Sequence, residues 1–129
     1  MRTYLIEPQT VFVSYLTDVL THAGLQVVAT KDDVDPRDIA VYDPAVVFVD
    51  VDFFERGAAN AVCRIRQSTR TATVIVLTEN DDPTFEAACY ISGASSVLLK
   101  RSGADQLIAA ARAATRGAAS AKPSPALAR

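Results

Sequence analysis

The sequence predicts an α/β fold: a doubly wound, five-stranded parallel sheet with five helices on its two faces. Three observations lead to this prediction. Short apolar runs of the β type alternate along the chain with segments of helical periodicity. The third run, residues 46–49, is apolar throughout, which is typical of a strand buried on both faces of a sheet. Four of the five runs end at a polar residue, at the edge where parallel sheets carry their ligand sites.

The strands follow from β-type apolar runs and from the turn residues that separate them. Leu25 opens the second run, directly after a glycine, and Pro44 opens the third, which ends at Asp50. The expected strands are residues 4–6, 25–29, 44–50, 73–77 and 96–99.

The helices follow from apolar residues at helical spacing and from their start and stop signals. Asp82 with Pro83 starts the fourth helix, because an N-cap acid is followed by proline at the first helical position, and Gly93 ends it. Its inward stripe is expected to include Cys89, with Ile91 as a further candidate. The five helices are expected around residues 12–23, 37–42, 58–65, 83–92 and 104–116.

The composition fits one globular domain. Of 129 residues, 50% are hydrophobic and 22% are charged, and the net charge is −2. This balance does not predict direct nucleic-acid binding or membrane binding, and no apolar run approaches the roughly 20 residues of a spanning helix. We expect the domain to occupy residues 1–117, and residues 118–129, which contain two prolines, to form a flexible tail or linker.

Two groups of side chains have simple structural interpretations. Cys63 and Cys89 lack metal-ligand spacing and are interpreted as buried small hydrophobic residues. Free cysteines and the absence of a signal-peptide pattern at the N-terminus together predict a cytoplasmic location. The arginines in and after the third helix are interpreted as a solvated face: Arg64, Arg66 and Arg70.

Four polar residues follow or end the buried strands. They are an acid, an acid, a hydroxyl and an amine: Glu7, Asp50, Thr78 and Lys100. Because carboxyl ends of parallel strands share one edge, these side chains are expected to converge there. That combination suits the handling of a phosphoryl group with a divalent metal ion.

In order and spacing, these motifs resemble the receiver domain of bacterial two-component response regulators. The resemblance covers residues 2–117, and it rests on the segment from Pro44 to Asp50, on Thr78 at the end of its strand, and on the segment from Gly93 to Lys100. It implies a flavodoxin-like sheet with strand order 2-1-3-4-5. It also implies a signalling domain and not an enzyme. Such a domain catalyses at most its own phosphorylation and dephosphorylation.

The resemblance assigns roles to the converging residues. Asp50 would be the phosphoacceptor, served by a histidine kinase or another phosphodonor. Thr78 and Lys100 would contact the phosphoryl oxygens, and Thr78 would move inward on activation. A Mg²⁺ ion would be held by Glu7, Asp50 and Asp52, the last through its backbone carbonyl. From the sequence alone, the Asp52 side chain is either a solvated acid or an additional metal ligand.

Three positions depart from the family pattern. Pro8 replaces the second of two adjacent acids, which is expected to weaken the binding of Mg²⁺. Glu79 stands where a small residue usually leaves the phosphoryl group a path, and its carboxylate could pair with Lys100 instead. Val97 occupies the position of the aromatic switch residue.

Two functions of different classes remain open on the sequence. One is a receiver switched by phosphorylation of Asp50, and the other is a pseudo-receiver, a protein-interaction module that works without phosphorylation. A flavodoxin-like enzyme or nucleotide binder is disfavoured, because no glycine-rich loop follows the first strand. The chain resembles the subgroup that carries a helix-turn-helix output, so a DNA-binding domain beyond residue 129 and a homodimer are expected as partners.

Overall fold

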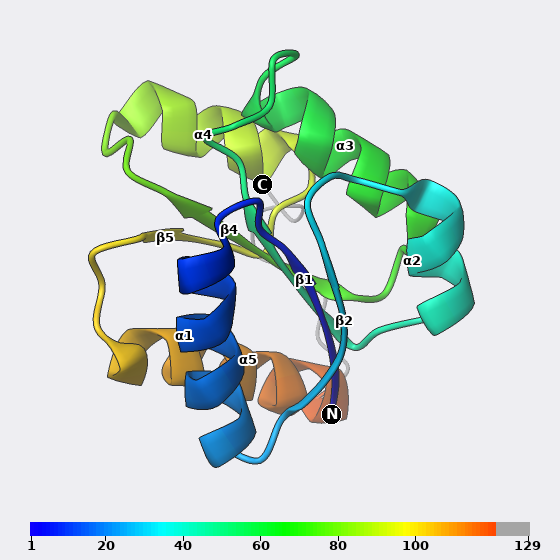
Figure 1. Cartoon of the computed structure of the whole chain (residues 1–129). Coiled ribbons are helices and arrows are strands. Elements are labelled where there is room, and N and C mark those ends of the chain that lie inside the picture. Colours follow the sequence, from blue (N-terminus) through cyan, green and yellow to red (C-terminus); the bar gives the residue numbers. More distant parts are fainter. Residues whose placement is uncertain (121–129) are drawn as a thin grey trace.

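The computed structural model describes the backbone of residues 1–120 and the side chains of residues 1–113. Five strands alternate with five helices along this part of the chain (Figure 1). The strands are β1 (Arg2–Ile6), β2 (Gln26–Lys31), β3 (Val46–Asp50), β4 (Thr73–Thr78) and β5 (Ser96–Leu99). The helices are α1 (Thr10–His22), α2 (Pro36–Tyr42), α3 (Ala58–Ser68), α4 (Pro83–Ser92) and α5 (Ala104–Ser120).

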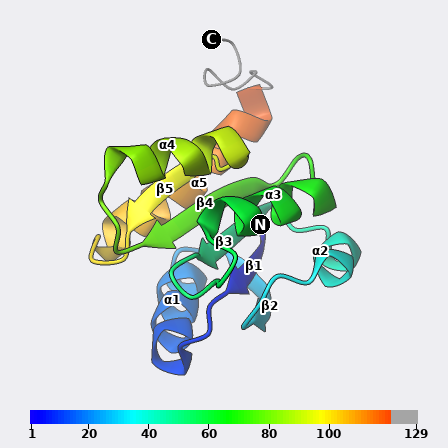
Figure 2. The same cartoon turned by 90° about the horizontal axis from the view of Figure 1, so that it is seen from above.

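The sheet has the order β2-β1-β3-β4-β5, and every neighbouring pair of strands is parallel. Helices α1 and α5 lie on one face of it, and α2, α3 and α4 lie on the other (Figures 1 and 2). The predicted doubly wound fold is therefore confirmed.

The central strand β3 lies between the two hydrophobic clusters of the fold. All five of its residues are buried, and alternate side chains enter two separate hydrophobic clusters. Val47 and Val49 pack with residues of α2, α3 and α4, whereas Val46 and Phe48 pack with residues of α1 and α5. The continuous apolar run was the correct signal for a strand covered on both faces.

The pairing of the strands brings their carboxyl ends to one edge. Asp50 is paired with Leu77, and Thr78 with Leu99. Backbone hydrogen bonds continue beyond the strand ends, from Glu7 N–H to Lys31 O at 2.7 Å and from Lys100 N–H to Thr78 O at 2.8 Å. These bonds extend the strand pairing to Glu7 and Lys100, the residues that follow β1 and β5.

Several predicted boundaries differ from the observed ones by a few residues. Leu25 precedes β2, because its N–H bonds to Leu20 O at 3.0 Å and closes the end of α1. Helix α5 continues past Arg116 to Ser120, which agrees with the high helix propensity of the alanines there. From residue 121 on, the expected tail lies outside the described residues. None of the helices described is both long enough and apolar enough to cross a membrane.

Three predictions about burial are wrong. Ile91 is 86% exposed, because it lies two residues, or about 200° of helical rotation, from the buried Cys89. Cys63 is exposed on α3. The Arg66 guanidinium is not solvated, since it donates to Ala72 O and Gly93 O, each at 2.7 Å, and so ties α3 to the start of β4 and the end of α4.

Candidate functional site

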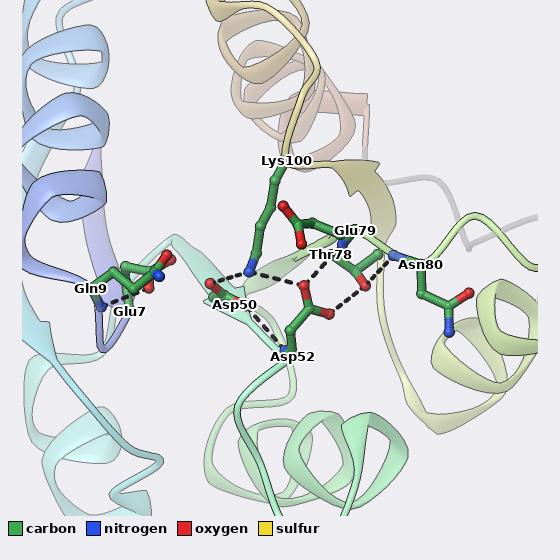
Figure 3. Close-up of polar contacts among 8 residues, drawn as sticks. All are labelled: Glu7, Gln9, Asp50, Asp52, Thr78, Glu79, Asn80 and Lys100. Atoms are coloured by element: carbon green, nitrogen blue, oxygen red, sulfur yellow. Dashed lines mark hydrogen bonds and ion pairs between the residues drawn. The ribbon is translucent and has the colours of Figure 1, made fainter.

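The site lies at the carboxyl edge of the sheet, around Asp50 at the end of β3. The Asp50 side chain is fully buried. In Figure 3 it lies between Glu7 on one side and a group formed by Lys100, Asp52 and Thr78 on the other. The structure therefore brings the predicted residues together from β1, β3, β4 and β5.

Lys100 forms the ionic centre of this group. Its Nζ lies 2.7 Å from Asp50 Oδ2 and 2.9 Å from Asp52 Oδ2, and its side chain is only 11% exposed. Burial acts to lower the pKa of Lys100, but the two carboxylates outweigh it and hold that pKa above its usual value. Lys100 is therefore charged at neutral pH and neutralises part of the acidic cluster.

Phe53 covers the same ammonium group, and sequence analysis missed it. Nζ of Lys100 lies 4.7 Å from the centre of the Phe53 ring, a cation–π geometry. Phe53 is half exposed and follows β3 by three residues. An aromatic residue three positions after the acid that ends the buried strand was the available signal.

The Asp52 carboxylate accepts contacts from three groups. Thr78 Oγ1 donates to Asp52 Oδ1 at 2.6 Å, while the Glu79 N–H donates to Asp52 Oδ2 at 2.9 Å and Lys100 pairs with the same oxygen. Burial raises the pKa of Asp52, but the bonds from Thr78, Lys100 and Glu79 outweigh burial and lower it. The Asp52 carboxylate, whose side chain is 23% exposed, is therefore engaged by three groups of the site and is not a free surface acid.

Thr78 is fixed in both of its hydrogen-bonding roles. Its hydroxyl donates to Asp52 and accepts from the Asn80 N–H at 3.0 Å, and the whole residue is buried. The hydroxyl therefore already points toward the acidic cluster. Val97, on the neighbouring strand β5, is partly buried and packs against the hydrophobic core.

Glu79 contributes through its backbone, and its side chain is exposed. In the part of the chain that the structure describes, the ion pairs of Lys100 are with Asp50 and Asp52. The pairing of Glu79 with Lys100 that the sequence allowed is therefore not observed. Asp50, at the end of β3, and Asp52, two residues later, are the acids that Lys100 Nζ contacts instead.

Glu7 is the third acid of the site and lies on the far side of Asp50 from Thr78 (Figure 3). It is 3% exposed, and its Oε2 accepts from the Gln9 N–H at 2.9 Å, whereas Oε1 has no hydrogen-bond partner. Burial raises the pKa of Glu7 to about 8, the adjacent Asp50 adds to this, and the Gln9 bond opposes it. This shift favours the protonated form of Glu7 at neutral pH. Pro8 is exposed and adds no ligand atom.

The carboxylates present fit a hard divalent cation only in part. Glu7 and Asp50 are adjacent, and the free Oε1 of Glu7 is a buried oxygen of the kind such a cation prefers. The side chain of Asp52 is turned away toward Thr78 and Glu79. Among the described residues, no cluster of three or more acidic, histidine or cysteine side chains has the arrangement of a metal site. Two carboxylates, with backbone oxygens and water, are what this chain offers.

Comparisons with known proteins identify a family that matches most of the chain. The family model described as the response regulator receiver domain matches residues 4–112. A comparison with curated proteins gave no match.

Solved structures of response regulators are similar in fold. The signal receiver domain of a response regulator designated NarL, from Mycobacterium tuberculosis, is 21% identical with a TM-score of 0.81, covering 90% of this chain and 96% of its own. A LuxR-family two-component response regulator from Aurantimonas is 24% identical with a TM-score of 0.80, covering 90% and 85%. A LuxR-family DNA-binding response regulator from Staphylococcus aureus is 17% identical with a TM-score of 0.77, covering 88% and 97%. At these identities the similarity supports the fold alone.

Proposed function

Because the chain belongs to the family of response regulator receiver domains, we propose that it receives a phosphoryl group on Asp50 and thereby switches an output domain or partner. The phosphodonor would be the phosphohistidine of a histidine kinase or a small acyl phosphate. The observation that supports this proposal is the buried Asp50 carboxylate held against the Lys100 ammonium at 2.7 Å. A buried acid beside a fixed cation, at the carboxyl edge of a parallel sheet, suits charged group transfer.

The chemistry assigned to Asp50 is nucleophilic. A carboxylate oxygen forms a bond to phosphorus while the P–N bond of the donor breaks, and the imidazole leaves with its electron pair and takes up a proton. Lys100 stabilises the charge on the phosphoryl oxygens as a point charge, and the Thr78 hydroxyl donates to one of them. This domain would catalyse its own phosphorylation and dephosphorylation, and no other reaction is assigned to it.

Mg²⁺ belongs to this proposal because receiver domains generally bind it at their acidic site. Glu7 and Asp50 would hold it through their carboxylates, and Asp52 through its backbone carbonyl. A bound divalent cation neutralises charge on the phosphoryl oxygens and on Asp50. Glu7 must lose its proton to become a ligand, and Pro8 supplies no second carboxylate, so binding should be weak and should release a proton.

The partners remain part of the proposal. A histidine kinase would act on this chain in the cytoplasm, and a DNA-binding output domain would follow beyond residue 129. A LuxR-family neighbour in fold is described as DNA-binding. Phosphorylation would shift the population between two existing conformations of β4, β5 and α4, a region that includes Val97. Formation of a homodimer would be one possible output of that shift.

We predict that the wild-type protein gains one phosphoryl mass when incubated with Mg²⁺ and acetyl phosphate, and that Asp50→Asn does not. Intact-mass spectrometry checks this, and Asp82→Asn is the matched control, since it removes an exposed acid at the start of α4. Asp82→Asn should be labelled as the wild type is. Labelling of Asp50→Asn to the wild-type level would place the acceptor elsewhere and would refute the role of Asp50.

The second candidate function is the pseudo-receiver, an interaction module that works without phosphorylation. The Asp52 carboxylate favours it, because that group already takes the donors of Thr78 and Lys100. The replacement of an acid by Pro8 favours it as well. If neither acetyl phosphate nor fluoroberyllate modifies the protein at saturating Mg²⁺, the pseudo-receiver becomes the better description.

A further inference from the structure

Three hydrogen-bond donors converge on one small volume beside Asp50. They come from the end of β4, from the first residue after it, and from the residue after β5: the Thr78 hydroxyl, the Glu79 N–H and the Lys100 ammonium. We refer to these three groups as the anion pocket. A hydroxyl, a backbone N–H and a cation that meet at one point form a site for an oxyanion.

A carboxylate of the protein itself fills the anion pocket. Asp52 Oδ1 accepts from Thr78 at 2.6 Å, and Oδ2 accepts from Glu79 at 2.9 Å and from Lys100 at 2.9 Å. Each carboxylate oxygen thus has at least one donor, as Figure 3 shows. All three distances are those of charge-assisted hydrogen bonds, which are stronger than neutral ones.

We propose that the anion pocket is an oxyanion-binding site whose resident ligand is the Asp52 carboxylate, and that an external oxyanion binds there only by displacing it. The external ligand is of the phosphoryl class, carried on Asp50, and in this respect the inference rests on the proposed function. Asp52 would then act as an internal surrogate for the phosphoryl group. It holds Thr78 inward before any phosphoryl transfer takes place.

The position of Asp52 makes it an effective competitor. It lies two residues after Asp50, and its own N–H donates to Asp50 Oδ1 at 3.0 Å, which fixes the backbone from which its side chain reaches the pocket. An anion tethered in this way competes at a high effective concentration. Asp52 also places a second negative charge next to Asp50, which opposes the approach of a negatively charged donor.

Two consequences distinguish this arrangement from an empty pocket. The Thr78 hydroxyl and the Glu79 N–H are engaged before phosphorylation, so the segment after β4 has little further to move when Asp50 is modified. Loading of Asp50 is also slow or weak, because the Asp52 carboxylate must first leave. Removing that carboxylate should therefore loosen the resting state and ease the loading of Asp50.

The first arm of the test needs no phosphorylation. In ¹H–¹⁵N spectra of the full chain, Asp52→Ala should move the Glu79 amide proton upfield, because that amide loses a charged acceptor. Asp52→Asn should move it less, since an amide oxygen still accepts. Glu55→Ala removes a carboxylate from the same loop after β3 and should leave the Glu79 resonance in place. An unchanged Glu79 resonance in Asp52→Ala, or an equal shift in Glu55→Ala, would overturn the proposal.

The second arm measures displacement with fluoroberyllate, a mimic of the phosphoryl group, at saturating Mg²⁺. We expect Asp52→Ala to bind fluoroberyllate at least about tenfold more tightly than the wild type does. A factor of about ten corresponds to the free energy of one charge-assisted hydrogen bond, which the Asp52 carboxylate no longer makes in the variant. Equal affinities in the wild type and Asp52→Ala would overturn displacement. If neither protein binds it, Asp50 is not a phosphoacceptor and the proposed function fails, while the Glu79 resonance still decides whether Asp52 fills the pocket.

Discussion

Replacing Lys100 with methionine is expected to lower the free energy of unfolding by about 3–5 kcal/mol near pH 8. The change keeps much of the aliphatic stem but leaves Asp50, which is fully buried, without its cation. Asp52 loses a partner at 2.9 Å in the same step. Removing one member of a buried ion pair costs more than the pair itself contributes, because the remaining charge stays desolvated. Urea unfolding followed by circular dichroism measures the loss.

The neighbouring residue supplies the control for this experiment. Arg101 pairs with Asp81 at 3.4 Å, but both side chains are exposed, at 64% and 74%. Arg101→Met removes the same charge one position along the chain, and we expect a change within about 0.5 kcal/mol. Equal losses for the two variants would mean that Lys100 acts through the general charge of the surface and not through the buried pair.

A double-mutant cycle identifies the partner of Lys100. If the loss comes from the uncompensated Asp50 carboxylate, Asp50→Asn should recover much of it in the Lys100→Met background. The loss should also shrink as the pH falls, because protonation of the acids relieves their repulsion. If Asp50→Asn instead adds its own loss to that of Lys100→Met, the two residues are not coupled.

The architecture could be predicted from the sequence because each element carried its own signal. The apolar run of β3, the Asp82–Pro83 start of α4 and the glycine after it agree with the final packing, and the sheet order came with the family resemblance. Two of the errors arose where a backbone contact outweighed a sequence pattern. Leu25 looked like the start of a strand, but its N–H closes α1. Arg66 looked solvated, but backbone carbonyls from two separate segments surround its guanidinium.

The residues of the site could be predicted from the sequence, but the hydrogen bonds and ion pairs among them could not. Strand ends alone brought Glu7, Asp50, Thr78 and Lys100 to one edge, because parallel strands share their carboxyl side. The direction of the Asp52 side chain was not encoded in that argument. It depends on which donors are free at the end of β4, and these are backbone and hydroxyl groups whose positions emerge only with the fold.

The contacts of the site relate the replacement of an acid by Pro8 to the position of the Asp52 carboxylate. Pro8 removes a carboxylate on the Glu7 side of Asp50, while the carboxylate of Asp52 sits on the Thr78 side. Negative charge is thus placed at the anion pocket instead of at the side where a cation would bind. If Asp52 fills the anion pocket as proposed, a chain arranged in this way would favour a resting state that already resembles the loaded one, and loading of Asp50 would be harder.

Glu7 gives the last prediction, a stability that falls as the pH rises from about 4.5 to about 8 in the absence of divalent cations. Burial, followed by the adjacent Asp50, raises the pKa of Glu7 from 4.5 to about 8 in the folded protein. Below pH 4.5 both states hold the proton. Between the two values the unfolded chain releases it while the folded chain keeps it, so the unfolded state gains relative stability. Above about pH 8 both states are ionised, and the folded state carries the full cost of the buried charge.

Glu7→Gln should remove this slope, because its amide cannot ionise. A shift of this size has an upper limit of about 5 kcal/mol, and since Asp50 and Lys100 share the same charge cluster we expect about 2–3 kcal/mol. The variant should thus be more stable than the wild type at pH 8 and should differ little from it near pH 4.5. Chemical unfolding at several pH values in a chelating buffer measures both curves, with Glu55→Gln as an exposed-acid control that keeps the wild-type slope. Parallel curves for Glu7→Gln and the wild type would show that Glu7 is ionised in the folded protein at neutral pH, with Lys100 or solvent compensating a charge that burial alone would suppress.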